Sequence, residues 1–362
     1  MHTPMTDAVR QRGVFDQHPF VLIDVGCAGG IAEAWRVFGP SLVAHGYDPD
    51  LAACDEARAR EQFAGVHYHA AYVGLPESHP SVQRRRAEAA KWPNTNIWDR
   101  VTAGYLASKK EEEIAEAGRV ADRSTLMGVP DIVRGEELPT VDFLKVDVDG
   151  PDIDVLESAR EVLVESQVIG VAVEVNWFGS ANPSEPTFHY TDRLMRQQGY
   201  TLFGITVRPY SRTDLPAPFR RELYAETHFG QPYQGDAIYM RDLAARYNHD
   251  VAAAYPVEKL LKLACIYELT GLPDCAAEVI NRFDSRLAAF GETEALLDAL
   301  TPPLLGEKLT YRDYISRFER DPQSFMPSAK ARRPAEVASA GGSVMRKMAR
   351  RMRQLSARKA AP

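Results

Sequence analysis

The sequence predicts an α/β fold built on an open, doubly wound parallel sheet. Over the first two thirds of the chain, short apolar runs rich in β-branched residues alternate with segments of helical spacing. Two of these runs, 141–148 and 168–175, are mostly apolar, as in strands that helices cover on both faces. The first run ends in glycines, which is typical of a turn from strand to helix. These patterns favour parallel strands joined by right-handed crossovers.

Seven strands are expected, with helices between them. The first strand precedes a helix expected over 31–38, the second precedes one over 51–62, and a third helix is expected over 152–164. The strands are expected at 20–25, 42–47, 66–73, 141–148, 168–175, 200–205 and 237–240.

Four segments make up the predicted organisation. Residues 1–243 form the Rossmann-like domain, and 75–134 is an insertion within it, long enough to act as a lid. Residues 244–320 have only helical spacing, broken by prolines and glycines, and are expected to form a small all-α module. Residues 321–362 are expected to be a basic flexible tail.

Composition excludes several classes of protein. The 362 residues are 45% hydrophobic and 26% charged, which argues against collagen-like, mostly disordered and disulfide-scaffold chains. The four cysteines have no partners at zinc-finger spacing and are expected to be reduced thiols. The first residues form no apolar signal segment, and no apolar run is long enough to span a membrane. A cytoplasmic protein is therefore expected.

Charge is distributed unevenly along the chain. Residues 329–362 contain ten Lys or Arg and one acid, Glu336, whereas the remaining residues carry a net charge of −16. An acidic body argues against nucleic-acid binding. Within the tail, Met345, Met348, Met352 and Leu355 recur at helical spacing among basic residues. Such a helix would suit the anionic inner face of a membrane or an anionic glycolipid, and a disordered, solubilising tail is the alternative.

The turn after the first strand, Asp24-Val25-Gly26-Cys27-Ala28-Gly29-Gly30, is the first candidate binding site. Gly26 and Gly30 let the backbone approach a ligand, with Cys27 between them. A carboxylate at Asp24 would repel a pyrophosphate and attract a cationic ligand. S-adenosylmethionine fits, because it carries a sulfonium and an ammonium but no phosphate. A plain tight turn is the alternative.

Two further residues are expected at the same edge of the sheet. Asp48 ends the second strand, where an acid can accept hydrogen bonds from both ribose hydroxyls, and its alternative role is to cap the next helix. Ala71, in the third strand, is small enough to leave room for adenine.

The carboxylates of the fourth and fifth strands are the candidate catalytic groups. Side chains alternate between the two faces of a strand, so Lys145, Asp147 and Asp149 are expected on one face. Glu174 is expected near the end of the neighbouring strand. Buried charges are costly unless they are paired or bind a ligand. A structural ion pair between Lys145 and Asp147 is the alternative interpretation.

These segments resemble the FkbM-type S-adenosylmethionine-dependent methyltransferases. The resemblance lies in residues 143–150 (Phe-Leu-Lys-Val-Asp-Val-Asp-Gly) followed by Asp154-Val155-Leu156, in residues 23–30, and in the segments 170–174 and 196–203. It covers roughly residues 21–242. It implies a class I methyltransferase fold of seven strands, the last antiparallel. It also implies O-methylation of a sugar hydroxyl in a polysaccharide, lipopolysaccharide or glycosylated metabolite, with a glycan or glycolipid as partner.

Methyl transfer to a sugar hydroxyl needs a group that accepts the hydroxyl proton. Asp147 and Glu174 are assigned as proton acceptors or, in the alternative, as ligands of Mg²⁺, which some members of the family use. His189 and His228 are the secondary candidate bases.

Two other functions remain open from the sequence. Asp147-Val148-Asp149 has the form of a DxD motif, as in metal-dependent glycosyltransferases, but that function leaves the glycine turn and Asp48 unexplained. A non-catalytic partner protein in glycan assembly is the third interpretation, in which the helical module binds other proteins.

Overall fold

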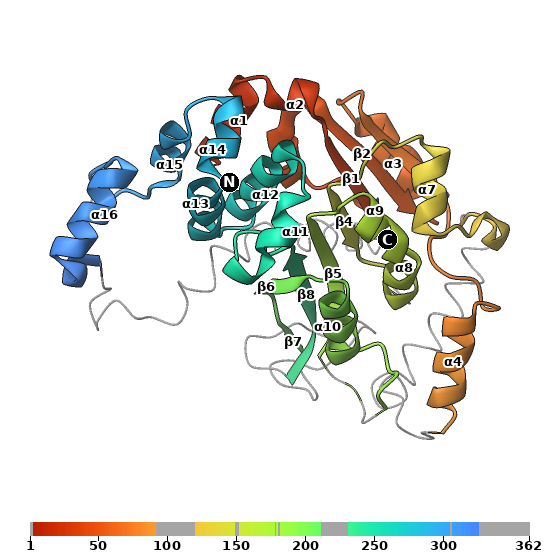
Figure 1. The fold of residues 1–362 in the computed structure, drawn as a ribbon. Helices are drawn as coiled ribbons and strands as arrows, with labels where there is room; N and C mark the ends of the chain where they lie inside the picture. Colours follow the sequence, from red (N-terminus) through yellow and green to blue (C-terminus); the bar gives the residue numbers. More distant parts are fainter. Residues whose placement is uncertain are drawn as a thin grey trace.

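A sheet of eight strands organises the chain (Figure 1). The computed structural model describes residues 3–91, 120–148, 152–177, 179, 182–210, 231–304 and 306–325. Residues 92–119 of the predicted insertion, Asp149, His228 and the predicted tail after residue 325 lie outside these ranges.

The order of the strands confirms the predicted fold class. The main path is β3-β2-β1-β4-β5-β8-β6, and β7 pairs with β8. β1 to β5 are parallel to one another, whereas β8 lies antiparallel between β5 and β6. The chain leaves β1 toward β2 on one side and returns to β4 on the other, so that the crossing lies between β1 and β4. The strands are β1 (Phe20–Val25), β2 (Leu42–Asp48), β3 (Val66–Ala70), β4 (Phe143–Val146), β5 (Gly170–Asn176), β6 (Thr201–Ile205), β7 (Arg208–Tyr210) and β8 (Gln231–Met240).

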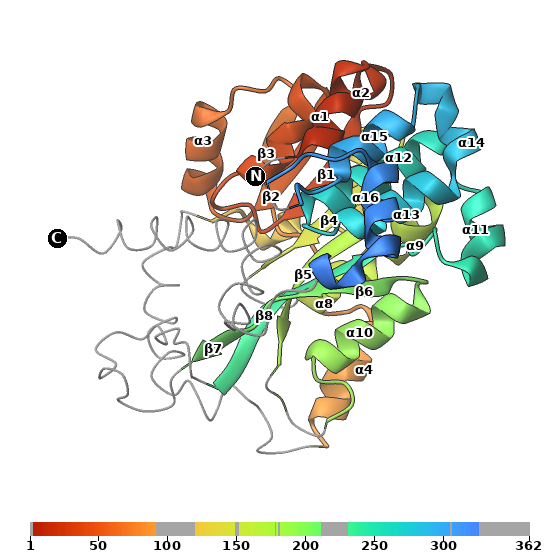
Figure 2. The same ribbon diagram turned by 90° about the vertical axis from the view of Figure 1, so that its left-hand side faces the viewer.

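Alternation along each strand divides the core between the two faces of the sheet. In β1, Phe20 and Leu22 enter one hydrophobic cluster, and Ile23 and Val25 enter the other. Helices cover both faces (Figures 1 and 2). The face of Ile23 packs against α7 (Val129–Gly135), α8 (Asp152–Ser158), α9 (Arg160–Glu165) and α10 (Phe188–Gln197). The face of Phe20 packs against α1 (Pro4–Gln11), α2 (Val14–Gln17), η1 (Glu33–Ser41), α3 (Leu51–Arg60) and α12 (Val257–Leu269).

Some predicted elements have different bounds. The helix expected over 31–38 is the 3₁₀ segment η1, which is broken at Gly39 (φ +64°) because Pro40 cannot continue a helix. The helix expected over 152–164 is divided into α8 and α9 around Ala159. β3 ends at Ala70, three residues earlier than expected, and β7 was not predicted.

The described residues of 244–320 contain most of the remaining helices, together with an isolated bridge between Leu304 and Glu307. They contain α11 (His249–Ala253), α12, α13 (Pro273–Arg282), α14 (Asp284–Leu287), α15 (Glu294–Leu300) and α16 (Tyr311–Arg320), with η3 (Arg246–Asn248) and η4 (Ala288–Phe290). The remaining helices are α4 (Pro80–Ala89), η2 (Arg123–Thr125) and η5 (Pro322–Phe325). Apolar side chains of α12, such as Leu260 and Leu263, share one cluster with Phe20 and Leu22 of β1. This helical segment therefore packs directly on the sheet.

Three buried charges join α12 to the amino end of the central strands. Asp142 is fully buried before β4, and its two oxygens lie 2.8 Å from the Nζ atoms of Lys259 and Lys262. Asp142 Oδ2 also accepts a hydrogen bond from the Val21 backbone N–H at 2.8 Å. Burial lowers the pKa of Lys259. The attraction of Asp142 opposes that effect and favours the charged form of Lys259.

None of the helices in the described ranges is long and apolar enough to cross a bilayer.

Candidate functional site

The glycine turn after β1 lies against the end of β4. Gly26 has φ +89°, and a Cβ at this position would lie 1.8 Å from the Asp147 carbonyl oxygen. Only glycine allows this close approach. The turn closes on itself, because Gly30 N–H donates to the Cys27 carbonyl at 2.7 Å. The predicted strand-to-helix turn is therefore present, at the crossing between β1 and β4.

Lys145 ties this turn to the carboxylates around it. Its Nζ lies 2.9 Å from Asp24 Oδ1, 3.2 Å from the Gly26 carbonyl oxygen and 3.6 Å from Asp147 Oδ2. Burial raises the pKa of Asp24, which is 1% exposed. Burial disfavours the charged form of Lys145 as well, but Asp24 and Asp147 outweigh it, so the pKa of Lys145 is raised. The ion pair that the sequence offered as an alternative is present, and Lys145 also binds Asp24.

Glu174 lies in a second group on the same face of the sheet. Its Oε1 is 2.5 Å from Arg208 Nη2, which is also 3.4 Å from Asp236 Oδ1. Glu174 and Asp236 face each other across β5 and β8. Burial, with added repulsion from Asp147, raises the pKa of Asp236. Burial also raises the pKa of Asp152, and repulsion from Glu174 and Asp147 adds to it.

The two groups form one cluster, which we call the acidic edge. In the described residues it contains five carboxylates and two cations: Asp24, Asp147, Asp152, Glu174 and Asp236, with Lys145 and Arg208. The sequence predicted that Asp24, Asp48, Asp147, Asp149 and Glu174 share one edge, and Asp149 lies outside the described residues. It did not identify Asp152 or Arg208, because nothing in their local pattern separates them from ordinary helix and strand residues.

The remaining predicted cofactor residues lie next to the turn, at the ends of β2 and β3. Asp48 Oδ1 accepts a hydrogen bond from Asp50 N–H at 2.8 Å, and it is Asp50 that caps α3 by accepting from Ala53 N–H. The alternative role of Asp48 as a helix cap is therefore wrong. Ala71 N–H donates to the Asp48 carbonyl at 3.2 Å, so these two residues are adjacent.

Cys27 and His189, the other two predicted site residues, differ in their surroundings. Cys27 is buried, and a hydrogen bond with Cys54 together with burial raises the pKa of its thiol. Its own backbone N–H donates to the Tyr47 carbonyl at 3.2 Å. His189 is exposed in the first turn of α10, where its Nδ1 lies 2.5 Å from Thr187 Oγ1. In the described part of the chain, no contact joins His189 to the acidic edge.

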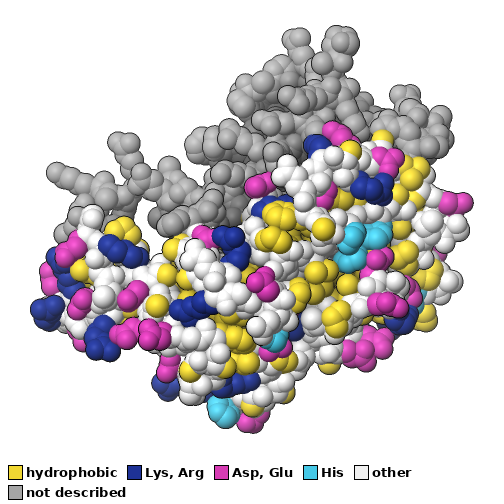
Figure 3. Space-filling model, turned by 90° about the horizontal axis from the view of Figure 1, so that it is seen from above, with side chains coloured by type: hydrophobic (Ala, Val, Ile, Leu, Met, Phe, Trp, Pro, Cys, Tyr) yellow, Lys and Arg dark blue, Asp and Glu magenta, His cyan; other side chains and the backbone are white. Residues whose placement is uncertain are grey.

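A second cluster was not predicted from the sequence. His45 on β2, His69 on β3 and Glu136, which follows α7, lie together on the face of the sheet that α7 covers. Figure 3 shows histidine side chains grouped beside acidic ones on the surface seen from above. The alternating His67-Tyr68-His69 pattern placed two histidines on one side of a strand, but Glu136 comes from a distant segment.

The His45 side chain predicts how stability depends on pH. Burial lowers the pKa of His45 to about 4, from 6.5 in an exposed chain. Between pH 6.5 and 4 the unfolded chain therefore binds a proton that the folded chain does not. The free energy of unfolding should consequently fall on acidification through this window, by about 3 kcal/mol from this residue.

Urea denaturation of the EDTA-treated protein at a series of pH values measures this effect. The His45→Asn variant should lose less stability between pH 7 and 4 than the unmodified chain. The His249→Asn variant, at an exposed position on α11, should follow the unmodified chain. Parallel curves for His45→Asn and the unmodified chain would contradict the prediction.

Comparison with known proteins finds a family match for part of the chain. Residues 90–202 match the family described as the methyltransferase FkbM domain. A search of curated proteins finds no match. Among solved structures, precorrin-6y C5,15-methyltransferase from Geobacter metallireducens is 8% identical, with 63% of this chain and 86% of that chain covered and a TM-score of 0.30. A TehB-like SAM-dependent methyltransferase from Corynebacterium glutamicum is 10% identical, with coverages of 64% and 87% and a TM-score of 0.27.

The family match includes the central part of the candidate site. It spans β4 and β5 and therefore Lys145, Asp147 and Glu174. The sequence resemblance had pointed to the same family from the same strands. Over residues 90–202, this chain is therefore similar to the methyltransferase FkbM domain.

Proposed function

We propose that the protein is an S-adenosylmethionine-dependent O-methyltransferase whose acceptor is a sugar hydroxyl of a polysaccharide, lipopolysaccharide or glycosylated metabolite. The observation that carries the proposal is the acidic edge beside the glycine turn, at the crossing between β1 and β4. In open α/β sheets, ligands bind outside the carboxyl ends of the strands at such a crossing. The sugar acceptor, a glycan or glycolipid, follows from the FkbM resemblance.

The charges of the acidic edge suit this cofactor. Five carboxylates outnumber two cations there, so the edge attracts a ligand that carries a sulfonium and an ammonium. When bound, S-adenosylmethionine supplies an activated methyl group. We assign the backbone of Gly26, Cys27 and Gly30 to the turn that borders it, Asp48 to its ribose hydroxyls, and Ala71 to the space for adenine.

Asp24 has an indirect role in this arrangement. It is 1% exposed and bound to Lys145, so it neutralises the lysine, whose Nζ also holds the Gly26 carbonyl. Without Asp24, Lys145 would keep only the more distant Asp147 as its partner, so more of its positive charge would face a cationic cofactor, and the glycine turn would lose part of its support.

Asp147 is the better placed of the two candidate proton acceptors. Its side chain is 20% exposed, and among the described residues it forms an ion pair only with Lys145, at 3.6 Å. The Glu174 side chain is 12% exposed and forms a tight ion pair with Arg208 at 2.5 Å. A carboxylate with a weak ion pair and access to solvent can accept the hydroxyl proton more readily. We therefore propose that Asp147 accepts the hydroxyl proton. Glu174 would help to position the sugar acceptor.

The same contacts argue against the Mg²⁺ site considered from the sequence. Lys145 already pairs with Asp147, and Arg208 with Glu174. A divalent cation between them would face two fixed positive charges, and Mg²⁺ binding depends on free oxygen ligands. These residues do not fit the metal, and the proposed mechanism uses none.

Calorimetric titration of the full-length protein with S-adenosylmethionine tests the proposal. We expect saturable binding to the unmodified chain, and an affinity at least about tenfold lower for Asp24→Ala because a charge of one unit is unbalanced beside the cofactor. Asp55→Ala, which removes an exposed acid on α3, should bind as the unmodified chain does.

Two results would contradict the proposal. One is unchanged affinity in the Asp24→Ala variant. The other is binding of a sugar nucleotide, but not of S-adenosylmethionine, which would favour the glycosyltransferase alternative.

A further inference from the structure

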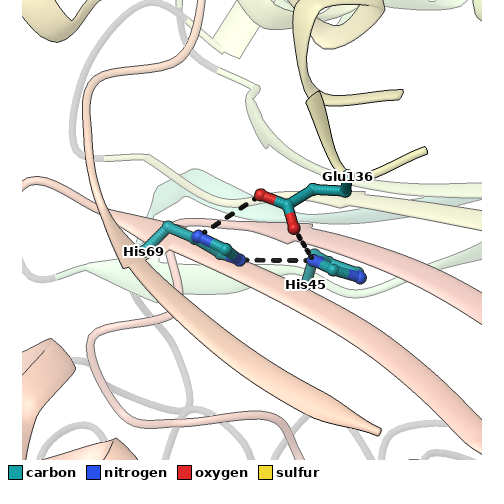
Figure 4. Close-up of side chains that lie close together, drawn as sticks. All are labelled: His45, His69 and Glu136. Carbon is teal, nitrogen blue, oxygen red and sulfur yellow. Dashed lines mark hydrogen bonds and ion pairs between the residues drawn. The ribbon is translucent and has the colours of Figure 1, made fainter. Parts of the chain in front are cut away.

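The cluster of His45, His69 and Glu136 has no part in the proposed methyl transfer. His45 pairs with Ile23 of β1 and His67 of β3 in the strand register, so it lies within the sheet and not at its carboxyl edge. Its side chain points to the face of α7, whereas the acidic edge lies on the opposite face. Figure 4 shows the three side chains pointing toward one another from β2, β3 and the end of α7. We propose that they bind one Zn²⁺ ion.

The distances agree with ligands around one ion. His45 Nδ1 lies 3.2 Å from His69 Nε2 and 3.4 Å from Glu136 Oε2. Two ligand atoms at about 2.0–2.1 Å from a tetrahedral Zn²⁺ ion are about 3.3–3.4 Å apart. One ligand atom from each of the three residues can be chosen so that all lie within 4.8 Å of one another. Small side-chain shifts are therefore sufficient to place the three around one ion.

The hydrogen-bonding capacity of the cluster also favours a cation. His45 Nδ1 is approached by both a ring nitrogen and a carboxylate oxygen, but one ring nitrogen carries either a single proton or a single lone pair. A metal ion between the three groups would accept one lone pair from each of them at once. Burial keeps the imidazole of His45 neutral at pH 7, the form that binds metal.

The neighbouring contacts would orient the ligands. Tyr47 Oη donates a hydrogen bond to Glu136 Oε1 at 3.3 Å, and His69 Nδ1 lies 3.5 Å from the same oxygen. The hydrogen bond from Tyr47 therefore holds Glu136 Oε1, which leaves Oε2 and His69 Nε2 to face the ion. Ligands of a bound metal commonly have such a second partner.

Access and ligand number favour zinc over harder cations. A cavity of about 470 Å³ borders the cluster and is lined by Tyr47, His69 and Glu136 among others. Three protein ligands leave a fourth position for water, as in open zinc sites, and imidazole ligands disfavour Mg²⁺. The ion would connect β2 and β3 to the segment between α7 and β4, and would stabilise the folded chain.

Titration of the EDTA-treated, dialysed full-length protein with ZnCl₂ tests the site. We expect one ion per chain at this site and no heat from MgCl₂. Glu136→Gln and His69→Ala should each weaken Zn²⁺ binding by about a hundredfold or more, since even residues behind the ligands contribute tenfold to a hundredfold. Glu137→Gln, at the adjacent exposed position, is the matched control and should bind as the unmodified chain does.

Two further measurements distinguish zinc binding at this cluster from misfolding of a variant and from zinc binding by cysteines. Thermal denaturation without metal shows whether each variant folds, and added ZnCl₂ should raise the melting temperature of the unmodified chain and of Glu137→Gln but not of Glu136→Gln. The absorption spectrum with Co²⁺ should lack a thiolate charge-transfer band, which excludes the cysteines as ligands. Equal Zn²⁺ affinity in Glu136→Gln and the unmodified chain, no Zn²⁺ binding at all, or a thiolate band would overturn the proposal. None of these readouts depends on S-adenosylmethionine.

Discussion

Asp142→Ala is expected to lower the free energy of unfolding by about 3–5 kcal/mol, because it leaves two buried ammonium groups without their partner. Lys259 and Lys262 both bind Asp142 at 2.8 Å, and their side chains are about as buried as the hydrophobic core around them. The Val21 backbone N–H would lose its acceptor as well. The measurement is urea denaturation at pH 7.

Two comparison variants distinguish the buried cluster from a general effect of removing an acid. Asp55→Ala breaks an exposed pair with Arg58 on α3 and should change stability by less than about 1 kcal/mol. The triple variant Asp142→Leu, Lys259→Met, Lys262→Met should recover most of the loss, since apolar residues of similar volume can replace a buried ionic group. A loss below about 1 kcal/mol for Asp142→Ala would show that the lysines find other partners there.

This cluster illustrates why burial of α12 could not be predicted. Its helical spacing was evident, but the sequence around Lys259 and Lys262 gave no sign that their ammonium groups would be inside the protein. Their partner is Asp142, about 120 residues earlier, and both lysines also bind backbone carbonyls near β1 and β4. Long-range pairs of this kind depend on the packing of elements and leave no local pattern.

The sheet could be predicted because its pattern is local. β1 and β4 follow from short apolar runs, and parallel pairing follows from the helices between them. The irregular pieces could not be predicted: η1 changes geometry at Gly39-Pro40, and a single residue, Ala159, separates α8 from α9. Helical spacing alone does not show such breaks, because the residues before and after them continue the same periodicity.

The candidate site was predictable to a similar extent. Parallel strands end at one edge, so Asp24, Asp147 and Glu174 were expected near one another. Of the two cations that pair with these carboxylates, only Lys145 could be predicted from the sequence. Lys145 lies in the same strand as Asp147, whereas Arg208 comes from β7, a three-residue strand that no apolar pattern marks.

Asp147→Asn is expected to reduce methyl transfer by about 10²–10⁴-fold, the range for removal of a group that accepts a proton in the transition state. The amide keeps the size of the side chain but cannot take the proton of a sugar hydroxyl. The affinity for S-adenosylmethionine should stay within a few-fold, because Asp24 still neutralises Lys145 and the Gly26 turn keeps its contact with Lys145.

The assay follows the transfer of a labelled methyl group from S-adenosylmethionine to a panel of polysaccharides, glycolipids and glycosylated metabolites. Asp192→Asn, which alters a surface pair with Arg196 on α10, is the matched control and should retain activity. Glu174→Gln provides the second comparison: it frees Arg208 beside Asp236, so it should affect acceptor binding and stability as well as rate. Full activity of Asp147→Asn together with complete loss in Glu174→Gln would transfer the proton acceptor to Glu174. Loss of cofactor binding in Asp147→Asn would instead place Asp147 among the groups that hold the cofactor.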